Sequence, residues 1–584
     1  MRVPLLRSSC LLPLLIASSA LAVTMVSVPL IGRAQTVVTN IIPDATLGTV
    51  VDSSGAPEGR TTVTITGGTR PGNGPTVFYS FADFNLSRGD IALFDSASAS
   101  GIVNAIIRVT GGNPSVIEGS LKAPSGVNLI FLNPNGLSVD QLSPYGISGY
   151  FVGSTASELH FADGSLFSMT TPAIALSATA IASLGFLDPA GSPTVLADID
   201  AGGALDFEGG AISLVDTSVF SKQRIGVHAT SLSLERSNLD VSLLDFLRAP
   251  SAIEIEVAEQ VNLSGGSRLS THYGNAPIRI RANEIGIDGS RIAFGFSSNA
   301  GIDDISIEAR SIRLSNGAAI SDSEGGERIR IAASDQIRLE RSIIGTFASG
   351  IPPAQIVIAD LGGAEGSLLV DLEGDSEIFT ILGGEPSFGQ QTIDIQAHTL
   401  RLDDSKVRTG SHSGRASFSI HADVARLLLS GGSEISVGGV ESQASGGNLA
   451  ITARDRVSLV GDSKLIATSD GAAGGNISLS GSPLLLVNDS TISAASTGSA
   501  LTGRPVNGGN VTLGSAEAPL RAVVLRGQSA IDASSSQAEG GNIAIHANAF
   551  VVSPDSNLIA TGATSNGSVT IDTPRQRGQA RSIR

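Results

Sequence analysis

The chain has 584 residues, more than one globular core usually holds, which indicates either several domains or one elongated repeat. It contains 69 Gly, no Trp, 4 Tyr and 16% charged residues, a composition that favours short strands with frequent turns over large compact cores. With 54 acidic and 37 basic residues the formal net charge is −17, which argues against binding to nucleic acid, heparin-like polymers or anionic membranes.

Residues 1–34 have the features of a secretory signal peptide. Arg2 and Arg7 form a basic start, and residues 10–31 carry no charge. Small residues at 20–22 or 32–34 offer cleavage sites. The alternative is an uncleaved anchor, because the uncharged run is just long enough to span a bilayer.

We expect cleavage after Ala34, because Pro13 and several Ser residues weaken the apolar run. Cys10 is the only cysteine, so the mature chain would contain none. An exported protein of this kind has no disulfides, and backbone pairing and the core must hold it together.

Residues 127–136 join a buried strand to a tightly specified turn. Five of the six residues 127–132 are apolar, which is too short for a helix and too apolar for a half-exposed strand, so we expect a strand covered on both faces. In the turn that follows, Pro134 pre-sets φ, Asn135 tolerates positive φ and Gly136 releases the chain. We expect this turn, with Asn133, to be exposed.

Four segments resemble, in the same order, the amino-terminal secretion domain of the filamentous haemagglutinin family. They are residues 78–86, 106–112, 128–136 and 154–156. The chain is most similar to the group in which Asn-Pro-Asn-Gly precedes an aliphatic residue, here Leu137. That group usually continues with Phe-Gly, whereas this chain continues with Ser-Val. The resemblance covers about residues 40 to 170 and, more loosely, the repeats beyond.

The resemblance implies an all-β fold, a right-handed parallel β-helix (solenoid). It implies a two-partner secretion exoprotein of a Gram-negative-type bacterium, exported through a dedicated outer-membrane transporter barrel and then secreted or held at the cell surface. The transporter would recognise Asn133, Pro134, Asn135 and Gly136, and the secretion domain would span residues 35–250. The exported rod would serve as an adhesin, with a cell surface or glycan as a further partner and with no cofactor.

From residue 253 onwards a short alternating apolar pattern recurs every 24 to 37 residues. Its copies begin at Ile253, Ile278, Ile305, Ile329, Ile356, Ile393, Phe418, Leu449, Ile477, Val511, Ile543 and Val569. Gly-Gly-Asn directly precedes the copies at Leu449, Ile477, Val511 and Ile543. A third marker, Ser-x-aliphatic, begins at residues 433, 463, 490, 529 and 556, between the alternating segments and the Gly-Gly-Asn motifs. Alternation with period two predicts strands, and recurrence at this spacing predicts stacked units.

Stacking the repeats buries a continuous apolar row that no single repeat could bury. A β-propeller is the alternative architecture to stacked coils, but propeller blades are usually longer than these repeats and carry aromatic signatures that the repeats lack. We therefore expect a β-helical rod over residues 251–572, followed by a basic disordered tail at 573–584. Stacking in phase predicts opposite charges on neighbouring coils, in particular Glu254 against Arg279, Glu256 against Arg281, and Arg281 against Glu308.

Sites for chemistry are scarce in this sequence. The seven His residues lack paired metal-ligand spacing, and no nucleophile elbow, phosphate loop or calcium-binding array occurs. The best carboxylate cluster is Asp198, Asp200, Asp206 and Glu208, which could form a calcium site or an acid pair. Arg88-Gly89-Asp90 matches an integrin-binding tripeptide but lies in a segment that aligns with a family strand.

We conclude from the sequence that the protein is not an enzyme. The main alternative is a secreted β-helical polysaccharide lyase or hydrolase, because that fold hosts such enzymes. A purely structural sheath protein is a third possibility, which binding to cells or surfaces would distinguish from an adhesin.

Overall fold

The computed structural model describes residues 37–573 apart from the segments 56–59, 96–100, 140–146, 170–175, 186–193, 197–198, 202, 243–251, 273–275, 295–304, 323–327, 349–353, 364–365, 383–389, 412–416, 439–445, 469–472 and 497–505. The predicted signal peptide and nearly all of the predicted basic tail lie outside these residues. In the described part the only helix is the 3-10 turn η1 (Pro71–Asn73), and no helix there is long and apolar enough to cross a membrane.

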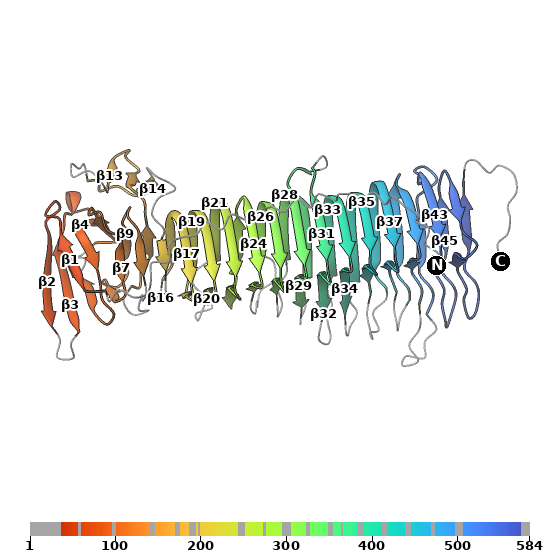
Figure 1. Ribbon diagram of the computed structural model, residues 1–584, viewed down its shortest axis with the longest axis horizontal. Helices are drawn as coiled ribbons and strands as arrows, with labels where there is room; N and C mark the ends of the chain where they lie inside the picture. Colours follow the sequence, from red (N-terminus) through yellow and green to blue (C-terminus); the bar gives the residue numbers. More distant parts are fainter. Residues whose placement is uncertain are drawn as a thin grey trace, which may run out of the picture. The chain divides into compact units, whose positions relative to one another are not determined.

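The largest sheet has 27 strands and forms one long face of the stacked coils (Figure 1). One row in it consists of β4 (Thr76–Asn85), β6 (Asn104–Val109), β9 (Asn128–Leu132), β11 (Phe151–Ser154), β17 (Leu205–Val215), β19 (Arg224–Glu235), β21 (Ala252–Ser264), β23 (Ile278–Arg281), β26 (Ile305–Ser315), β28 (Arg328–Glu340), β30 (Ala354–Asp360), β33 (Gln390–Asp403), β35 (Ser417–Ser430), β37 (Asn448–Val460), β39 (Asn476–Gly481), β42 (Asn510–Leu513), β45 (Ile543–His546) and β48 (Val569–Asp572).

A second row in the same sheet includes the later parts of the long strands. Its separate strands are β7 (Ser115–Ile117), β10 (Leu137–Val139), β15 (Thr194–Leu196), β24 (Glu284–Asp288), β31 (Leu369–Glu373), β40 (Leu484–Asn488), β43 (Ala522–Arg526) and β46 (Phe550–Val552). The pairings along both rows are parallel, and only β1 (Asn40–Pro43) joins this sheet antiparallel, against β4.

The opposite face is a 14-stranded parallel sheet. It contains β16 (Ile199–Ala201), β18 (Ser218–Ser221), β20 (Asn238–Ser242), β22 (Arg268–His272), β25 (Arg291–Phe294), β27 (Ala319–Asp322), β29 (Ile343–Ala348), β32 (Glu377–Leu382), β34 (Lys406–Ser411), β36 (Glu434–Val437), β38 (Lys464–Ile466), β41 (Thr491–Ser493), β44 (Ala530–Asp532) and β47 (Asn557–Ile559).

Two small sheets belong to the amino-terminal coils. One contains β2 (Thr49–Gly55), β3 (Thr61–Gly67), β5 (Ile91–Phe94) and β8 (Ser120–Lys122), and the other contains β12 (Glu158–Phe161), β13 (Leu166–Ser168) and β14 (Ile181–Gly185). The fold is therefore a parallel β-helix, as the sequence predicts.

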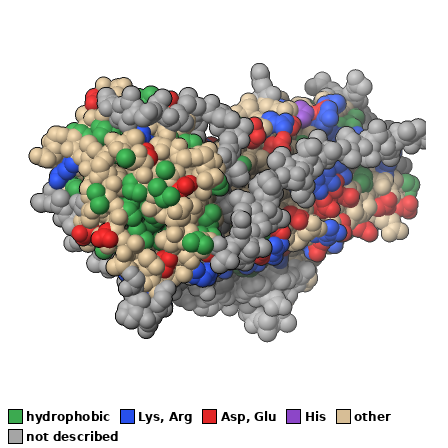
Figure 2. Space-filling model, turned by 60° about the vertical axis from the view of Figure 1, so that its left-hand side comes forward, with side chains coloured by type: hydrophobic (Ala, Val, Ile, Leu, Met, Phe, Trp, Pro, Cys, Tyr) green, Lys and Arg blue, Asp and Glu red, His purple; other side chains and the backbone are tan. Residues whose placement is uncertain are grey.

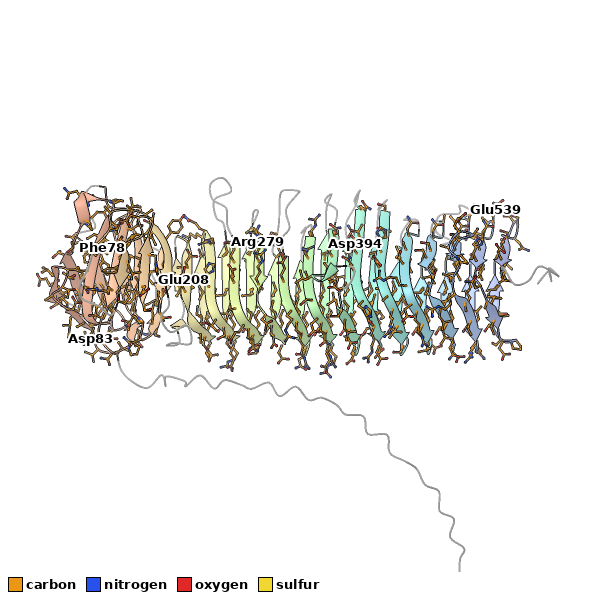
Figure 3. The ribbon with its side chains drawn as sticks, turned by 90° about the horizontal axis from the view of Figure 1, so that it is seen from above. Phe78, Asp83, Glu208, Arg279, Asp394 and Glu539 are labelled. Carbon is orange, nitrogen blue, oxygen red and sulfur yellow. The ribbon has the colours of Figure 1, made fainter. Side chains whose placement is uncertain are left out.

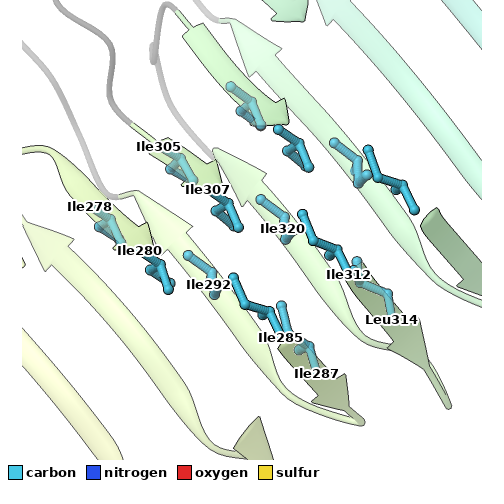
Figure 4. Close-up of a cluster of buried hydrophobic side chains, with 14 of the residues drawn as sticks. Ile278, Ile280, Ile285, Ile287, Ile292, Ile305, Ile307, Ile312, Leu314 and Ile320 are labelled. Atoms are coloured by element: carbon cyan, nitrogen blue, oxygen red, sulfur yellow. The ribbon is translucent and has the colours of Figure 1, made fainter. Parts of the chain in front are cut away.

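A continuous apolar core runs inside the coils from Val63 to Ala560. Figure 4 shows part of it, where Ile278 and Ile305 occupy equivalent positions on neighbouring coils. Ile253, Ile278 and Ile305 are fully buried and are direct partners in the ladder, which confirms the predicted repeat phase.

One repeat start is wrong by two residues. Ile420, and not Phe418, is the ladder partner of both Ile393 and Leu449. Phe418 points to the same inner face and is buried, so the alternating pattern fits either start.

The outer face carries the predicted alternation of charge. Arg279 Nη1 lies 3.1 Å from Glu254 Oε1, and Arg281 Nε lies 3.1 Å from Glu308 Oε2. Glu256 stands opposite Arg281 in the ladder, as predicted, but its carboxylate lies 3.7 Å from His228 Nδ1 of the preceding coil. Figure 2 shows acidic and basic side chains interspersed over the coils beyond the amino-terminal ones.

Serines at the same corner of the earlier coils form a buried ladder that reaches Ser433, the first of the marker serines. The Ser376 backbone N–H donates to Ser405 Oγ at 3.3 Å, and the Ser405 N–H donates to Ser433 Oγ at 3.2 Å. Each hydroxyl also donates to a carbonyl of its own turn, as Ser405 does to Asp403 at 2.9 Å. The residue before the serine often takes a left-handed conformation, as Asp404 does at φ 50°. The hydroxyls thus supply acceptors for corner amides that the strand ladder leaves out.

The predicted domain boundary near residue 250 falls in a segment outside the described residues. The strands before and after it, β19 and β21, pair over most of their length, and the core continues across them. The boundary therefore stays a prediction about export.

Candidate functional site in the amino-terminal coils

The four segments that carry the family resemblance stack directly on one another. Strand β4 pairs with β6, β6 with β9, and β9 with β11, all in parallel. The inner side chains include closely packed aromatic rings, with 5.1 Å between the centroids of Phe84 and Phe131. The segments are therefore successive layers of one structural unit.

Strand β9 is covered on both faces, as its apolar sequence predicts. Leu129 and Phe131 point into the main core. Ile130 and Leu132 point outwards into a second apolar cluster, which also contains Phe78, labelled in Figure 3. Leu159, Phe161 and Phe167 of strands β12 and β13 belong to this second cluster, so the accessory sheet β12–β14 packs over the outside of the coils.

The turn after β9 is bonded to the coils on either side of it. The Asn133 backbone N–H donates to the Ser154 carbonyl at 3.0 Å, and its side-chain Nδ2 donates to the Asn113 carbonyl and to Ser115 Oγ, each at 3.0 Å. Asn133 Oδ1 accepts from the Asn135 N–H at 2.9 Å, which closes the turn from within.

The prediction of an exposed turn is wrong for Asn133 and Gly136, which are both buried, while Pro134 and Asn135 are half-buried. Positive φ also falls on Gly136, at 124°, and not on Asn135. Local turn chemistry identifies the turn, but the burial comes from neighbouring coils that meet it only after folding.

Arg108 is a functional candidate that sequence reasoning missed. Its side chain is fully buried, and its guanidinium donates to Ser80 Oγ at 2.8 Å, to Thr46 Oγ1 at 2.8 Å and to the Ser168 carbonyl at 3.0 Å. Asp44 Oδ2 lies 3.7 Å from Arg108 Nη2. One cation therefore links the segment before β2, strand β4 and the end of the accessory strand β13.

The hydrogen bonds of this network favour the ionised form of the Asp44 carboxyl group. Burial acts to raise the pKa of Asp44, but hydrogen bonds from Ser80, Thr46 and Thr110 outweigh it, and the pKa lies below its ordinary value. Burial lowers the pKa of Arg108, and the Asp44 carboxylate opposes that shift. The only sequence signal for this site is an arginine within an apolar strand.

The predicted carboxylate cluster is divided between two sheets. Asp200 lies on β16, whereas Asp206 and Glu208 lie on β17, and Asp198 is outside the described residues. Asp206 Oδ1 accepts from Arg224 Nη2 at 2.5 Å. Burial raises the pKa of Glu208, labelled in Figure 3, and the nearby His228 opposes that shift.

No group of three or more His, Cys, Asp or Glu side chains is arranged to hold a metal ion within the described residues. Five of the histidines each lie 3.2–3.7 Å from a single carboxylate oxygen, namely His160, His228, His272, His421 and His546. His412 lies outside the described residues.

The Arg-Gly-Asp tripeptide forms a turn, with Gly89 at φ 88°. The Asp90 carboxylate accepts from the Thr61 N–H at 2.7 Å and from the Thr39 hydroxyl. These bonds tie Asp90 to two neighbouring segments, which favours a structural role over integrin recognition.

The model of the TPS (two-partner secretion) secretion domain matches residues 39–346, more than half of the chain. This chain belongs to that family. It is thus a two-partner secretion exoprotein, and the match covers all four resembling segments as well as the first coils of the predicted rod. No curated protein matches the chain.

Among the solved structures to which the chain is similar is the HMW1 secretion domain from Haemophilus influenzae. The alignment has 12% sequence identity, covers 78% of this chain and 97% of that chain, and has a TM-score of 0.25.

Proposed function

We propose that this exoprotein is exported through a dedicated outer-membrane transporter barrel and acts outside the cell as an adhesin-like rod. The observation that carries the proposal is the secretion-domain match over residues 39–346. The fold suits such a route, because coil-on-coil contacts are local along the rod and can form progressively as the chain emerges.

We also propose that the transporter recognises the segment Asn133 to Gly136 before the coil that contains it folds. In the folded state Asn133 is fully buried and its amide is occupied by Asn113 and Ser115. Direct contact with the transporter is therefore possible only in the unfolded chain. The folded turn would then form outside the cell.

The test compares two changes that remove the same folded-state hydrogen bond. Asn133→Ala deletes the donor to Ser115 and alters the recognition segment, whereas Ser115→Ala deletes only the acceptor hydroxyl. We expect both to destabilise the folded coil, and only Asn133→Ala to reduce the amount of protein outside transporter-bearing cells. An equal loss of export in both variants would show that the segment acts through the fold alone, and normal export of Asn133→Ala would contradict the proposal.

The proposed exoprotein has no enzymatic role. A lyase or hydrolase would need several carboxylates gathered in one groove, but Asp200 lies on a different sheet from Asp206 and Glu208, and Asp206 is bonded to Arg224. Turnover of acidic or neutral glycans by the secreted protein, with or without calcium, would contradict this part of the proposal. Binding of the protein to cells or glycan surfaces would support the adhesin role over a purely structural sheath.

A further inference from the structure

One column of outward-facing residues changes character along the large sheet. Successive ladder partners in this column are Arg313, Arg338, Asp371 and Arg401. From the next coil onwards the partners are Leu428, Ser458, Leu486, Val524 and Val551. Charged residues, of which Asp371 and Arg401 form an ion pair, thus give way to mainly apolar residues in the same structural position.

We name Leu428, Leu484, Leu486, Val524 and Val551 the apolar strip. The first four alternate with core residues along their strands and therefore face away from the core, and Val551 is the ladder partner of Val524 on the next strand. Val551 is 55% exposed, and the other four are half-buried between neighbouring outer side chains. Leu486, Val524 and Val551 are successive ladder partners, whereas Ser458 stands between Leu428 and Leu486. Outward apolar side chains gathered in this way form a candidate contact surface.

The strands that carry the strip limit how a partner can approach. Strands β35, β40 and β43 are each paired on both sides and offer no free edge to an added strand, whereas β46, which carries Val551, pairs only with β43 among the described strands. β37 and β43 are labelled in Figure 1. A partner that contacts Leu428, Leu484, Leu486 and Val524 must therefore lie on the outer side chains.

Arginines flank the strip on both sides. Arg456 is the ladder partner of Leu484, and Arg526 is the ladder partner of Asn488, in the column beyond Leu486. Both are exposed, and neither makes an ion pair with another described residue. By contrast, the nearby Arg426 and Arg521 share the carboxylate of Asp455.

Unpaired cations on both flanks select the charge of the partner. The chain is acidic overall, at −17, so two local cations without partners stand out against their surroundings. A second copy meeting this face symmetrically would oppose arginine to arginine, which is unfavourable. An acidic partner would pair with both flanks.

We propose that the apolar strip binds an acidic amphipathic α-helix of a partner protein. The helix would lie along the coil axis, with its apolar stripe on the strip and with Asp or Glu against Arg456 and Arg526. Neighbouring strands are about 4.8 Å apart, close to the pitch of about 5.4 Å of an α-helix, so successive helical turns meet successive coils. Five strands span about 19 Å, which corresponds to roughly 13 helical residues.

A lipid surface fits these features less well than a helix. The strip is only one to two side chains wide, and four of its five members are half-buried. Membrane-surface binding strengthens with the apolar area inserted, which is small here. A single helix about 10 Å in diameter matches the width of the strip.

The test measures fluorescence anisotropy of labelled 14-residue peptides with the full mature chain. The peptides are an amphipathic helix with a Leu stripe and Glu flanks, the same helix with Lys flanks, and a scrambled acidic sequence. We expect saturable binding of the first peptide only. Double substitution Leu486→Ser with Val524→Ser should weaken it by roughly tenfold or more, because both apolar contacts are lost.

Charge reversal provides a matched control. Arg526→Glu should weaken binding several-fold, whereas Arg291→Glu, the same change on an exposed residue of the opposite sheet, should leave it unchanged. Far-ultraviolet circular dichroism and thermal unfolding would confirm that each variant keeps its fold. Equal binding of the basic or scrambled peptide, or no binding at all, would overturn the proposal. It would also fail if the strip bound anionic lipid vesicles or a second copy in place of the acidic helix.

Discussion

The buried Arg108 network provides a sharp prediction about the amino-terminal coils. Arg108→Met keeps an apolar stem of similar length but removes the donors to Ser80, Thr46 and the Ser168 carbonyl. Removing one partner of a buried ion pair typically costs about 3–5 kcal/mol. Asp44 has 10% of its side chain exposed, so water can partly replace the lost cation, and we expect about 3 kcal/mol.

A loss of this size should act locally. The network holds the accessory sheet and the segment before β2 against strands β4 and β6, whereas distant coils contact only their neighbours. About 3 kcal/mol corresponds to roughly a hundredfold change in an opening equilibrium. Amide hydrogen exchange of strands β12 to β14 should therefore become about a hundred times faster, while the coils beyond residue 300 keep their protection.

The control is Arg279→Met on an exposed coil. Arg279 is 49% exposed and pairs with Glu254, and such surface pairs contribute roughly 0.2–1 kcal/mol. This variant should show little change in exchange anywhere. Unchanged protection of β12 to β14 in Arg108→Met, or an equal loss along the whole rod, would refute the reasoning.

Three further predictions follow from the coils and from the amino terminus. Ser405→Ala should destabilise the folded chain by about 1–3 kcal/mol in urea unfolding, because the buried Ser376 N–H loses its acceptor, and an unchanged midpoint would contradict the role given to the serine ladder. Burial raises the pKa of Glu208, so the stability associated with this group falls as pH rises through its folded-state pKa. Glu208→Gln should therefore melt at a higher temperature than the native chain at neutral pH, and the difference should vanish below the ordinary carboxyl pKa; a lower melting temperature at neutral pH would reverse the assigned sign. Amino-terminal sequencing of the exported protein should begin at Gln35, whereas a retained Arg2 would indicate an uncleaved anchor.

The repeat architecture could be predicted because it depends on sequence patterns within each strand and turn. Strand alternation places Ile253 and Ile278 inside, and the outward Glu254 and Arg279 then meet without further information. The one error, Phe418 for Ile420, follows from the same rule, since positions two apart share a face.

The environment of the candidate site could not be predicted in this way. The hydrogen-bond partners of Arg108 lie 28 to 62 residues away in sequence, and no local pattern specifies them. The burial of Asn133 likewise depends on Asn113 and Ser115 of the neighbouring coil. Turn chemistry identifies the type of a turn, whereas its exposure is decided by what folds against it.

The most direct test of the account is transporter-dependent export of the full-length chain. The measurement compares the amount of protein outside cells that make the cognate outer-membrane barrel with the amount outside cells that lack it. The account predicts mature protein outside only when the barrel is present, and retention in the periplasm when it is absent. Equal release from both kinds of cell would contradict the central claim.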